Sequence, residues 1–310
     1  PPPPRPPPPP TTPHKKTKPP TPPPPPPPPP PRPPPPPPPP PTTGRFDPHR
    51  YGVDFLETGA ARRFITAHHY TRTFPQVRYC LGMWNLYTPE APRLVGVLTL
   101  SNGTNVLTLT NAFPGLVPYE QSLVLSRLIL DDTVPANGES WFTAQALRLA
   151  SDEGLRAVVA FSDPSEYWQI RNGRRERVKR GHHGGVYQAS NFQFAGQTKA
   201  SWKLYFPDGP ELSRRAISKI TGGEVGHGGV VARLIAYGAP PLTDGTDPRA
   251  WFETAAAAAG LERRKHPGNY TYTLRTGRTR AQRTRTRIAL PSLPYPKPQL
   301  ILPGLDTTLP

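Results

Sequence analysis

The chain has 310 residues, 51 of them proline, and its 38 Lys and Arg against 21 Asp and Glu give a formal net charge of +17. This charge favours an anionic partner, with nucleic acid the first candidate. Cys80 is the single cysteine, which excludes an intrachain disulfide and a cysteine-based zinc cluster, and its apolar neighbours predict a buried thiol. The sequence has no signal peptide and no apolar stretch of membrane-spanning length, so we expect a cytoplasmic protein.

Composition divides the chain into three parts. Residues 1–43 hold 31 of the prolines and no Val, Ile, Leu, Phe, Trp or Tyr, so we predict a disordered arm of polyproline II and coil. Residues 44–275 are predicted to form one α/β domain. Residues 276–310 are basic and then proline-rich, and they are predicted to form a disordered tail.

The first half of the domain predicts a helix over residues 53–72, which Pro75 ends, and then strands over 78–87, 94–100 and 122–130. These strands are expected to form an antiparallel meander. A loop leads to a helix over 140–153, with Asn137 as its N-cap and Gly154 at its end, and a buried strand follows over 155–161. This order predicts a mixed, mostly antiparallel sheet flanked by helices.

The second half begins with a basic segment, 164–181, which is interpreted as a surface insertion. A glycine-rich loop and one short helix are expected next, before Phe192. Further along we predict a strand over 202–206, a loop over 222–229, a helix over 248–260 and a last strand over 270–274.

Four stretches resemble, in order, the sequence pattern of the Mom family. They are His69-Tyr70-Thr71, Ser126-Arg127-Leu128, Asn137-Gly138-Glu139-Ser140, and Phe161-Ser162-Asp163 followed by Gly181–Phe192 (GHHGGVYQASNF). The last stretch is the specific one, although here residues 164–181 separate its two parts. The resemblance spans about residues 55–275, and Lys265–Tyr270 is similar to the family's approach to its last strand.

The resemblance implies a GNAT-like acyltransferase fold and an enzyme that converts adenine in DNA to N6-carbamoylmethyladenine, which protects phage DNA from host restriction. It assigns acetyl-CoA binding to Arg127 and Ser140, beside Asn137. It places His69, Tyr70, Asp163 and Tyr187 in the reaction centre, and their imidazole, carboxylate and phenolate groups suit iron as a cofactor. Alternatively, Tyr70 or Asp163 acts as a base on the adenine N6.

Double-stranded DNA is the expected partner, because the basic insertion and tail offer cations for its phosphates. The candidate DNA-binding residues are Arg174, Arg175, Arg177, Lys179, Arg180, Arg278, Arg280 and Arg283. Modification at N6 requires extrusion of the base, and Tyr167 and Trp168 are candidates to fill or flank the gap. Two other functions stay open: an ordinary N-acetyltransferase acting on a small amine or protein, and a non-catalytic DNA-binding protein. Structural roles also stay open for single residues, such as an ion pair of Arg127 with Glu139 or a core position for Tyr187.

Overall fold

The structure is a computed structural model, and it describes residues 44–69, 73–87, 92–171, 173–179 and 181–297, apart from the side chains of 171, 178 and 179. The proline-rich arm, Tyr70 and Arg180 therefore lie outside the described residues. Within the described ranges, no helix is long and apolar enough to cross a membrane.

A seven-stranded sheet forms the centre of the domain, in the order β1-β2-β3-β4-β5-β12-β8. Its strands are β1 Tyr51–Phe55, β2 Val77–Asn85, β3 Arg93–Ser101, β4 Ser122–Leu130, β5 Ala157–Ser162, β8 Gln193–Gln197 and β12 Tyr270–Arg275. Strands β1 to β4 form an antiparallel meander, and β4 and β5 pair in parallel. The predicted mixed, mostly antiparallel sheet is confirmed.

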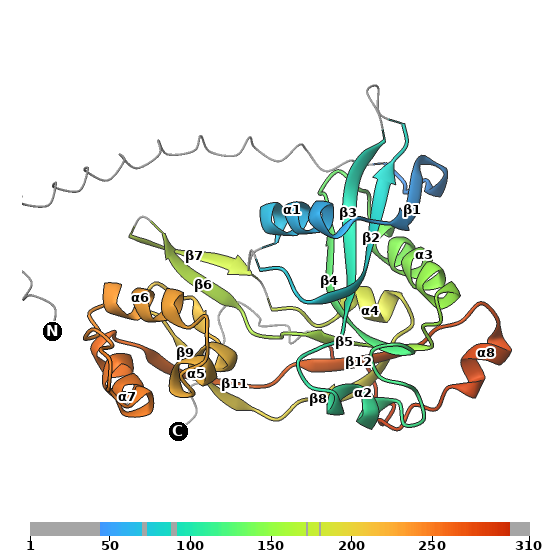
Figure 1. Ribbon diagram of the computed structural model, residues 1–310. Coiled ribbons are helices and arrows are strands. Elements are labelled where there is room, and N and C mark those ends of the chain that lie inside the picture. Colours follow the sequence, from blue (N-terminus) through green and yellow to red (C-terminus); the bar gives the residue numbers. More distant parts are fainter. Residues whose placement is uncertain (1–43, 70–72, 88–91, 172, 180, 298–310) are drawn as a thin grey trace, which may run out of the picture. The chain divides into compact units, whose positions relative to one another are not determined.

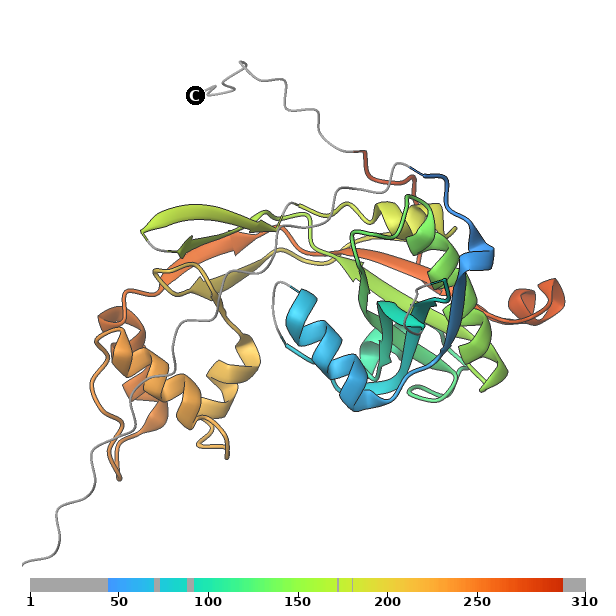
Figure 2. The ribbon, with the colours of Figure 1, turned by 90° about the horizontal axis from the view of Figure 1, so that it is seen from above.

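Helices cover both faces of the sheet, as Figures 1 and 2 show for α1 and α3. The elements are α1 Thr58–His68, α2 Leu107–Ala112, α3 Gly138–Asp152 and α4 Gly185–Ala189. Phe142 and Leu147 of α3 pack in one core with Leu81 of β2, whereas Ile65 of α1 packs in another core with Cys80, the next residue along the same strand. Successive residues of a strand point to opposite faces, so α3 and α1 lie on opposite sides of the sheet. The buried thiol of Cys80 is confirmed.

The predicted helix over 53–72 is wrong in its first residues. Residues 51–55 form β1, where Val53 lies opposite Met83 of β2. The helix starts later because the Glu57 carboxylate accepts hydrogen bonds from the backbone N–H groups of Gly59 (2.8 Å) and Ala60 (2.9 Å). This capping marks the start of the helix and so separates it from the strand, although the apolar residues of both segments have a spacing that fits one continuous helix.

Strands β4 and β5 pair over only part of their length. Ser122–Leu125 lies beside Ala157–Ala160, and beyond this register β4 follows β3 as far as Leu130 while β5 follows β12 as far as Ser162. The carboxyl ends of the two parallel strands therefore separate.

A second, smaller core is built on a continuation of the β8–β12 ribbon. Strands β9 (Ser201–Tyr205) and β11 (Glu262–His266) pair with each other, and β10 (Glu211–Leu212) joins β9. Helices α5 (Arg214–Thr221), α6 (Gly228–Ala236) and α7 (Pro248–Ala258) pack here around Phe206, Leu234 and Trp251. The helix predicted over 248–260 is confirmed, whereas this helical lobe as a separate core was not predicted.

The basic insertion forms a hairpin of β6 (Tyr167–Arg171) and β7 (Arg174–Lys179). The guanidinium groups of Arg175 and Arg177 lie 4.8 and 5.8 Å from the centre of the Trp168 ring. The ends of the insertion meet, since the backbone N–H of His182 donates to the carbonyl of Asp163 (2.9 Å). The insertion therefore leaves the two parts of the fourth family-like stretch next to each other.

The prediction of a disordered tail from residue 276 is wrong for residues 276–297. Helix α8 (Arg280–Arg285) begins with a capping box between Thr279 and Gln282. Arg278 forms an ion pair with Asp152 of α3, and the Tyr295 hydroxyl donates to the Phe192 carbonyl (2.7 Å). Specific capping and packing contacts order this segment in spite of its charge.

Candidate active site

Tyr187 of α4 is buried among the aromatic rings of Phe192 and Tyr272, at centroid distances of 5.2 and 5.3 Å. Its helix starts at Gly184, whose φ of +77° suits glycine and where a Cβ would lie 2.4 Å from the Tyr272 ring. Burial raises the pKa of Tyr187, and the nearby Glu139 carboxylate raises it further, against a smaller lowering by Arg127. The phenol is therefore held neutral, and it lies within electrostatic reach of both α3 and β4.

Arg127 lies in the middle of β4, opposite Thr99, where the strand moves away from β5. Its guanidinium donates to the Ser126 carbonyl (2.7 Å) and to the Thr73 hydroxyl (3.2 Å). Thr73 follows the predicted His69-Tyr70-Thr71 stretch almost directly. The hydrogen bond therefore ties the end of that segment to the separated part of β4.

The turn before α3 has Asn137 at its predicted N-cap position. Its φ is +75°, and its side chain makes no capping hydrogen bond. The Asn137 carbonyl instead accepts from the Ser140 hydroxyl (3.1 Å). Gly138 is buried where a Cβ would lie 2.3 Å from Val134, so the close approach requires glycine. Burial raises the pKa of Glu139 in the first turn.

Asp163 follows β5 directly, on the other side of the separation. Its Oδ1 accepts from the backbone N–H of Ser165 (2.8 Å) and pairs with Nε2 of His266 (2.9 Å). Nδ1 of His266 accepts from the Gly268 N–H (3.1 Å), so Nε2 carries the proton and donates to the carboxylate. The His266 side chain is only 5% exposed, whereas that of Asp163 is 33% exposed. His266 therefore orients Asp163 and leaves part of the carboxylate accessible.

His182 connects Asp163 with Tyr187. Its backbone binds Asp163, its Nδ1 accepts from the Gly184 N–H (2.8 Å), and its ring lies 6.1 Å from that of Tyr187. Burial raises the pKa of Tyr205 to about 12, with smaller contributions from Glu211 and Asp163. Tyr205 and His266 are therefore site neighbours that were not predicted as site residues, although His266 lies in the family-like stretch Lys265–Tyr270, and both come from the β9–β11 ribbon.

The predicted ligand set is only partly described. His69 forms the C-cap of α1, where its backbone N–H donates to the Ile65 carbonyl (2.8 Å), and Tyr70 lies outside the described residues. Among the described residues, no three His, Cys, Asp or Glu side chains are grouped so that they could hold a metal ion. The predicted set of His69, Tyr70, Asp163 and Tyr187 takes two of its four ligands from tyrosine, which such a grouping does not include. The set therefore stays a prediction.

Residues 50–227 match the Mom protein family, and this range includes Arg127, Ser140, Asp163 and Tyr187. The chain belongs to the Mom protein family. In this Mom-family chain, the matched range ends between α5 and α6, so β11, β12 and His266 lie beyond it. A search of curated proteins found no match.

Three of the solved structures to which this chain is similar are acetyltransferases. An Escherichia coli GNAT-family N-acetyltransferase in complex with CoA is 13% identical, covers 49% of this chain and 72% of its own, and has a TM-score of 0.29. A Bacillus subtilis acetyltransferase in complex with CoA is 8% identical, covers 74% of this chain and 99% of its own, and has a TM-score of 0.32. An Enterococcus faecium aminoglycoside 6'-N-acetyltransferase is 7% identical, covers 52% of this chain and 93% of its own, and has a TM-score of 0.28. With such low scores, the family assignment of the Mom-family chain rests on its sequence match.

The candidate DNA-binding residues of this Mom-family chain fall in two places. Arg174, Arg175 and Arg177 are exposed on β7, where Lys179 also lies. The others belong to the folded tail, where Arg278 pairs with Asp152, Arg280 is exposed and Arg283 donates to the Gly277 carbonyl (2.8 Å). The tail leaves the sheet at the end of β12, where Arg275 lies opposite Ala157 of β5. Asp163 follows the other end of β5, and the strand between them is roughly 17 Å long.

Proposed function

We propose that this chain modifies adenine in double-stranded DNA to N6-carbamoylmethyladenine, which would protect phage DNA from restriction. The observation that carries the proposal is the meeting of distant family-like segments where β4 and β5 separate. Arg127 binds Thr73 on one side, Asp163 meets His182 on the other, and Tyr187 lies within electrostatic reach of Arg127. A non-catalytic DNA-binding protein would not need this convergence.

The proposed product joins N6 of adenine to a methylene carbon, so N6 must lose a proton. We assign the proton acceptor to Asp163, because His266 and the Ser165 N–H orient its carboxylate and its side chain is partly exposed. Tyr187, held neutral by burial, acts as a hydrogen-bond donor. Adenine N6 is paired inside a duplex, so the base must leave the stack to reach these groups.

Acetyl-CoA is the proposed acyl carrier, and the first turn of α3 fits its phosphates. The helix is 15 residues long, and its backbone N–H groups and dipole favour an anion at this end. Arg127 and the Ser140 hydroxyl add a cation and a polar group. When bound, the carrier would supply the two carbon atoms of the carbamoylmethyl group. Joining N6 to the methyl carbon removes two electrons and turning the thioester into an amide releases CoA and takes up ammonia or an amine donor, so the reaction also requires a two-electron oxidant and a nitrogen donor. Calorimetric titration of acetyl-CoA should show weaker binding to Arg127→Ala than to the wild type, and equal binding would remove this part of the proposal.

The predicted iron set is not fully described, because Tyr70 lies outside the described residues. Iron would be held by His69, Tyr70, Asp163 and Tyr187, whose imidazole, carboxylate and phenolate groups suit it. Oδ1 of Asp163 already accepts two hydrogen bonds, from Ser165 and His266. We therefore derive no step through a metal, and metal analysis of purified wild type and His69→Ala addresses the predicted set directly.

Mass spectrometry of nucleosides tests the function. DNA from cells that express the wild type should contain deoxyadenosine heavier by one carbamoylmethyl group, and Asp163→Asn should abolish it. Asp244→Asn, an exposed position in the helical lobe, serves as the matched control and should leave the product unchanged. Unmodified DNA with the wild type, or acetylation of an amine or protein instead, would contradict the proposal.

A further inference from the structure

A pocket of about 450 Å³ lies under the folded tail, at the far end of α3 from its first turn. We call it the tail pocket. Its walls come from the second half of α3, the end of α4 and the segment after β12. Four arginines line it, namely Arg148, Arg275, Arg278 and Arg283. The volume lies in the range of small-ligand sites.

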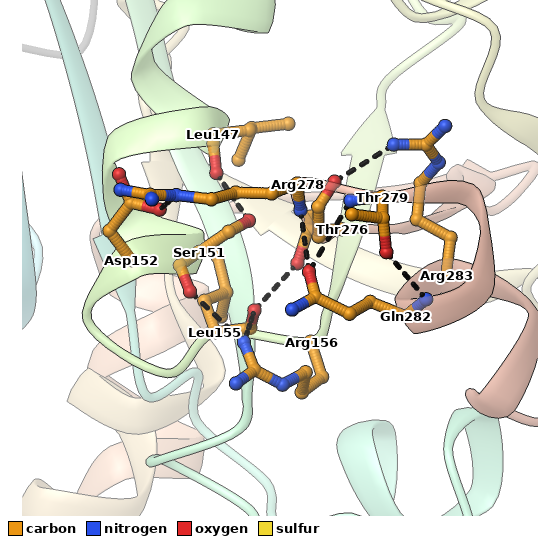
Figure 3. A network of polar contacts seen from close by, with 11 residues as sticks. Leu147, Ser151, Asp152, Leu155, Arg156, Thr276, Arg278, Thr279, Gln282 and Arg283 are labelled. Atoms are coloured by element: carbon orange, nitrogen blue, oxygen red, sulfur yellow. Dashed lines mark hydrogen bonds and ion pairs between the residues drawn. The ribbon is translucent and has the colours of Figure 1, made fainter.

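The charges of the tail pocket are only partly balanced. Its described lining residues include no acid, and the nearest paired carboxylate is that of Asp152, which holds Arg278 (Figure 3). Arg283 donates one hydrogen bond to the Gly277 carbonyl (2.8 Å), and Arg275 donates one to the Thr286 carbonyl (2.7 Å). A guanidinium carries five N–H donors, so these hydrogen bonds fix the two arginine side chains and leave most of their donors for a ligand.

The end of α4 supplies an independent observation. Ser190 is one of the lining residues, and its buried hydroxyl has no hydrogen-bond partner among the described residues. A buried polar group without a partner costs free energy, so it indicates a missing ligand or solvent contact. Cations and an unpartnered hydroxyl together suit a phosphate.

We propose that the tail pocket binds a phosphate of a DNA backbone, away from the site where the base reacts. This inference rests on the proposed function, which makes DNA the partner. The occupant is a polynucleotide because exposed arginines continue beyond the pocket along the tail, farther than a single phosphate reaches. They are Arg280, Arg285 and Arg287. The pocket thus fixes the duplex at one end of β5 while a base reaches Asp163 at the other.

Fluorescence anisotropy with a labelled duplex tests the inference. Arg148→Gln and Arg283→Gln should each weaken binding, and the double variant should lower the slope of log Kd against log salt concentration by about 0.9, the value for one phosphate contact. Arg249→Gln, an exposed arginine on α7, is the matched control and should change neither. Unchanged affinity and slope in an Arg148→Gln/Arg283→Gln double variant that melts like the wild type would overturn the inference.

Ser190→Ala separates a ligand contact from a structural role. Removing an unpartnered buried hydroxyl should leave the melting temperature unchanged or higher, while duplex binding weakens. Equal duplex binding by this variant would count against the pocket. If dAMP alone binds as tightly as the duplex, the pocket serves a free nucleotide and the polynucleotide assignment is wrong.

The two proposals fail separately. Duplex binding that depends on Arg148 and Ser190, together with unmodified nucleosides, would leave the tail pocket standing and remove the adenine chemistry. If the DNA contains the modified nucleoside and the pocket variants bind the duplex like the wild type, the adenine chemistry stands and the tail pocket is removed.

Discussion

His266 offers the most direct test of how the ribbon serves the reaction. His266→Leu removes the donor that orients Asp163 and leaves the buried Gly268 N–H without its acceptor. A hydrogen bond to a charged group contributes about 1.5–3 kcal/mol, so if Asp163 depends on it in the transition state, kcat should fall roughly 10- to 150-fold. The affinity for DNA should stay the same, because His266 is buried behind Asp163.

Steady-state modification of a duplex over a range of DNA concentrations gives kcat and KM independently. Denaturant unfolding should show a loss on the order of 3 kcal/mol from the two broken hydrogen bonds together. His266→Gln is the matched variant, since its side-chain amide can replace the Nε2 donor, and it should recover most of kcat. If His266→Leu loses stability but keeps the wild-type kcat, His266 is purely structural and its role as a positioning residue is wrong.

Three other outcomes follow from the structure. Gly138→Ala would force a Cβ to within 2.3 Å of Val134, so unfolding experiments should show a loss of about 1–3 kcal/mol. The hydrogen bond from Arg278 lowers the pKa of Asp152 from its ordinary value of 3.8. The ion pair therefore stabilises the fold above pH 3.8, and this stabilisation is lost as the pH falls through the lower pKa of the folded state. The melting temperatures of the wild type and Asp152→Asn should differ at pH 7 and converge in acid. Arg175→Gln in the hairpin should weaken duplex binding and lower its salt dependence in anisotropy titrations, and an unchanged titration would exclude this side chain from the DNA interface.

The centre of the sheet could be predicted because its elements carry strong local patterns. The predicted bounds of β4 coincide with those observed, and Gly154 ends α3 with a φ of +99°. Continuous apolar runs between turn residues leave little alternative there. The capping box of Thr279 and Gln282 was equally visible in the sequence, but the charge of the tail outweighed it in the prediction.

The site was harder to predict because its contacts join distant residues. His266 and Asp163 are 103 positions apart, and only the pairing of β12 with β5 brings the approach to β12 beside the end of β5. His266 also lies in a strand of charged residues, where no apolar pattern marks it as buried. The helical lobe was missed for a similar reason, since its core depends on how three short helices meet.

The ribbon that carries the helical lobe has an evolutionary consequence. The chain enters the lobe after Tyr205 and returns at Glu262, and these two residues lie directly opposite each other in the β9–β11 ladder. A segment whose ends are already neighbours can be gained, lost or exchanged without changing the register of the strands that hold it. Residues 206–261 therefore form a unit that a related gene could replace with a short turn, while Asp163 and His266 stay in place.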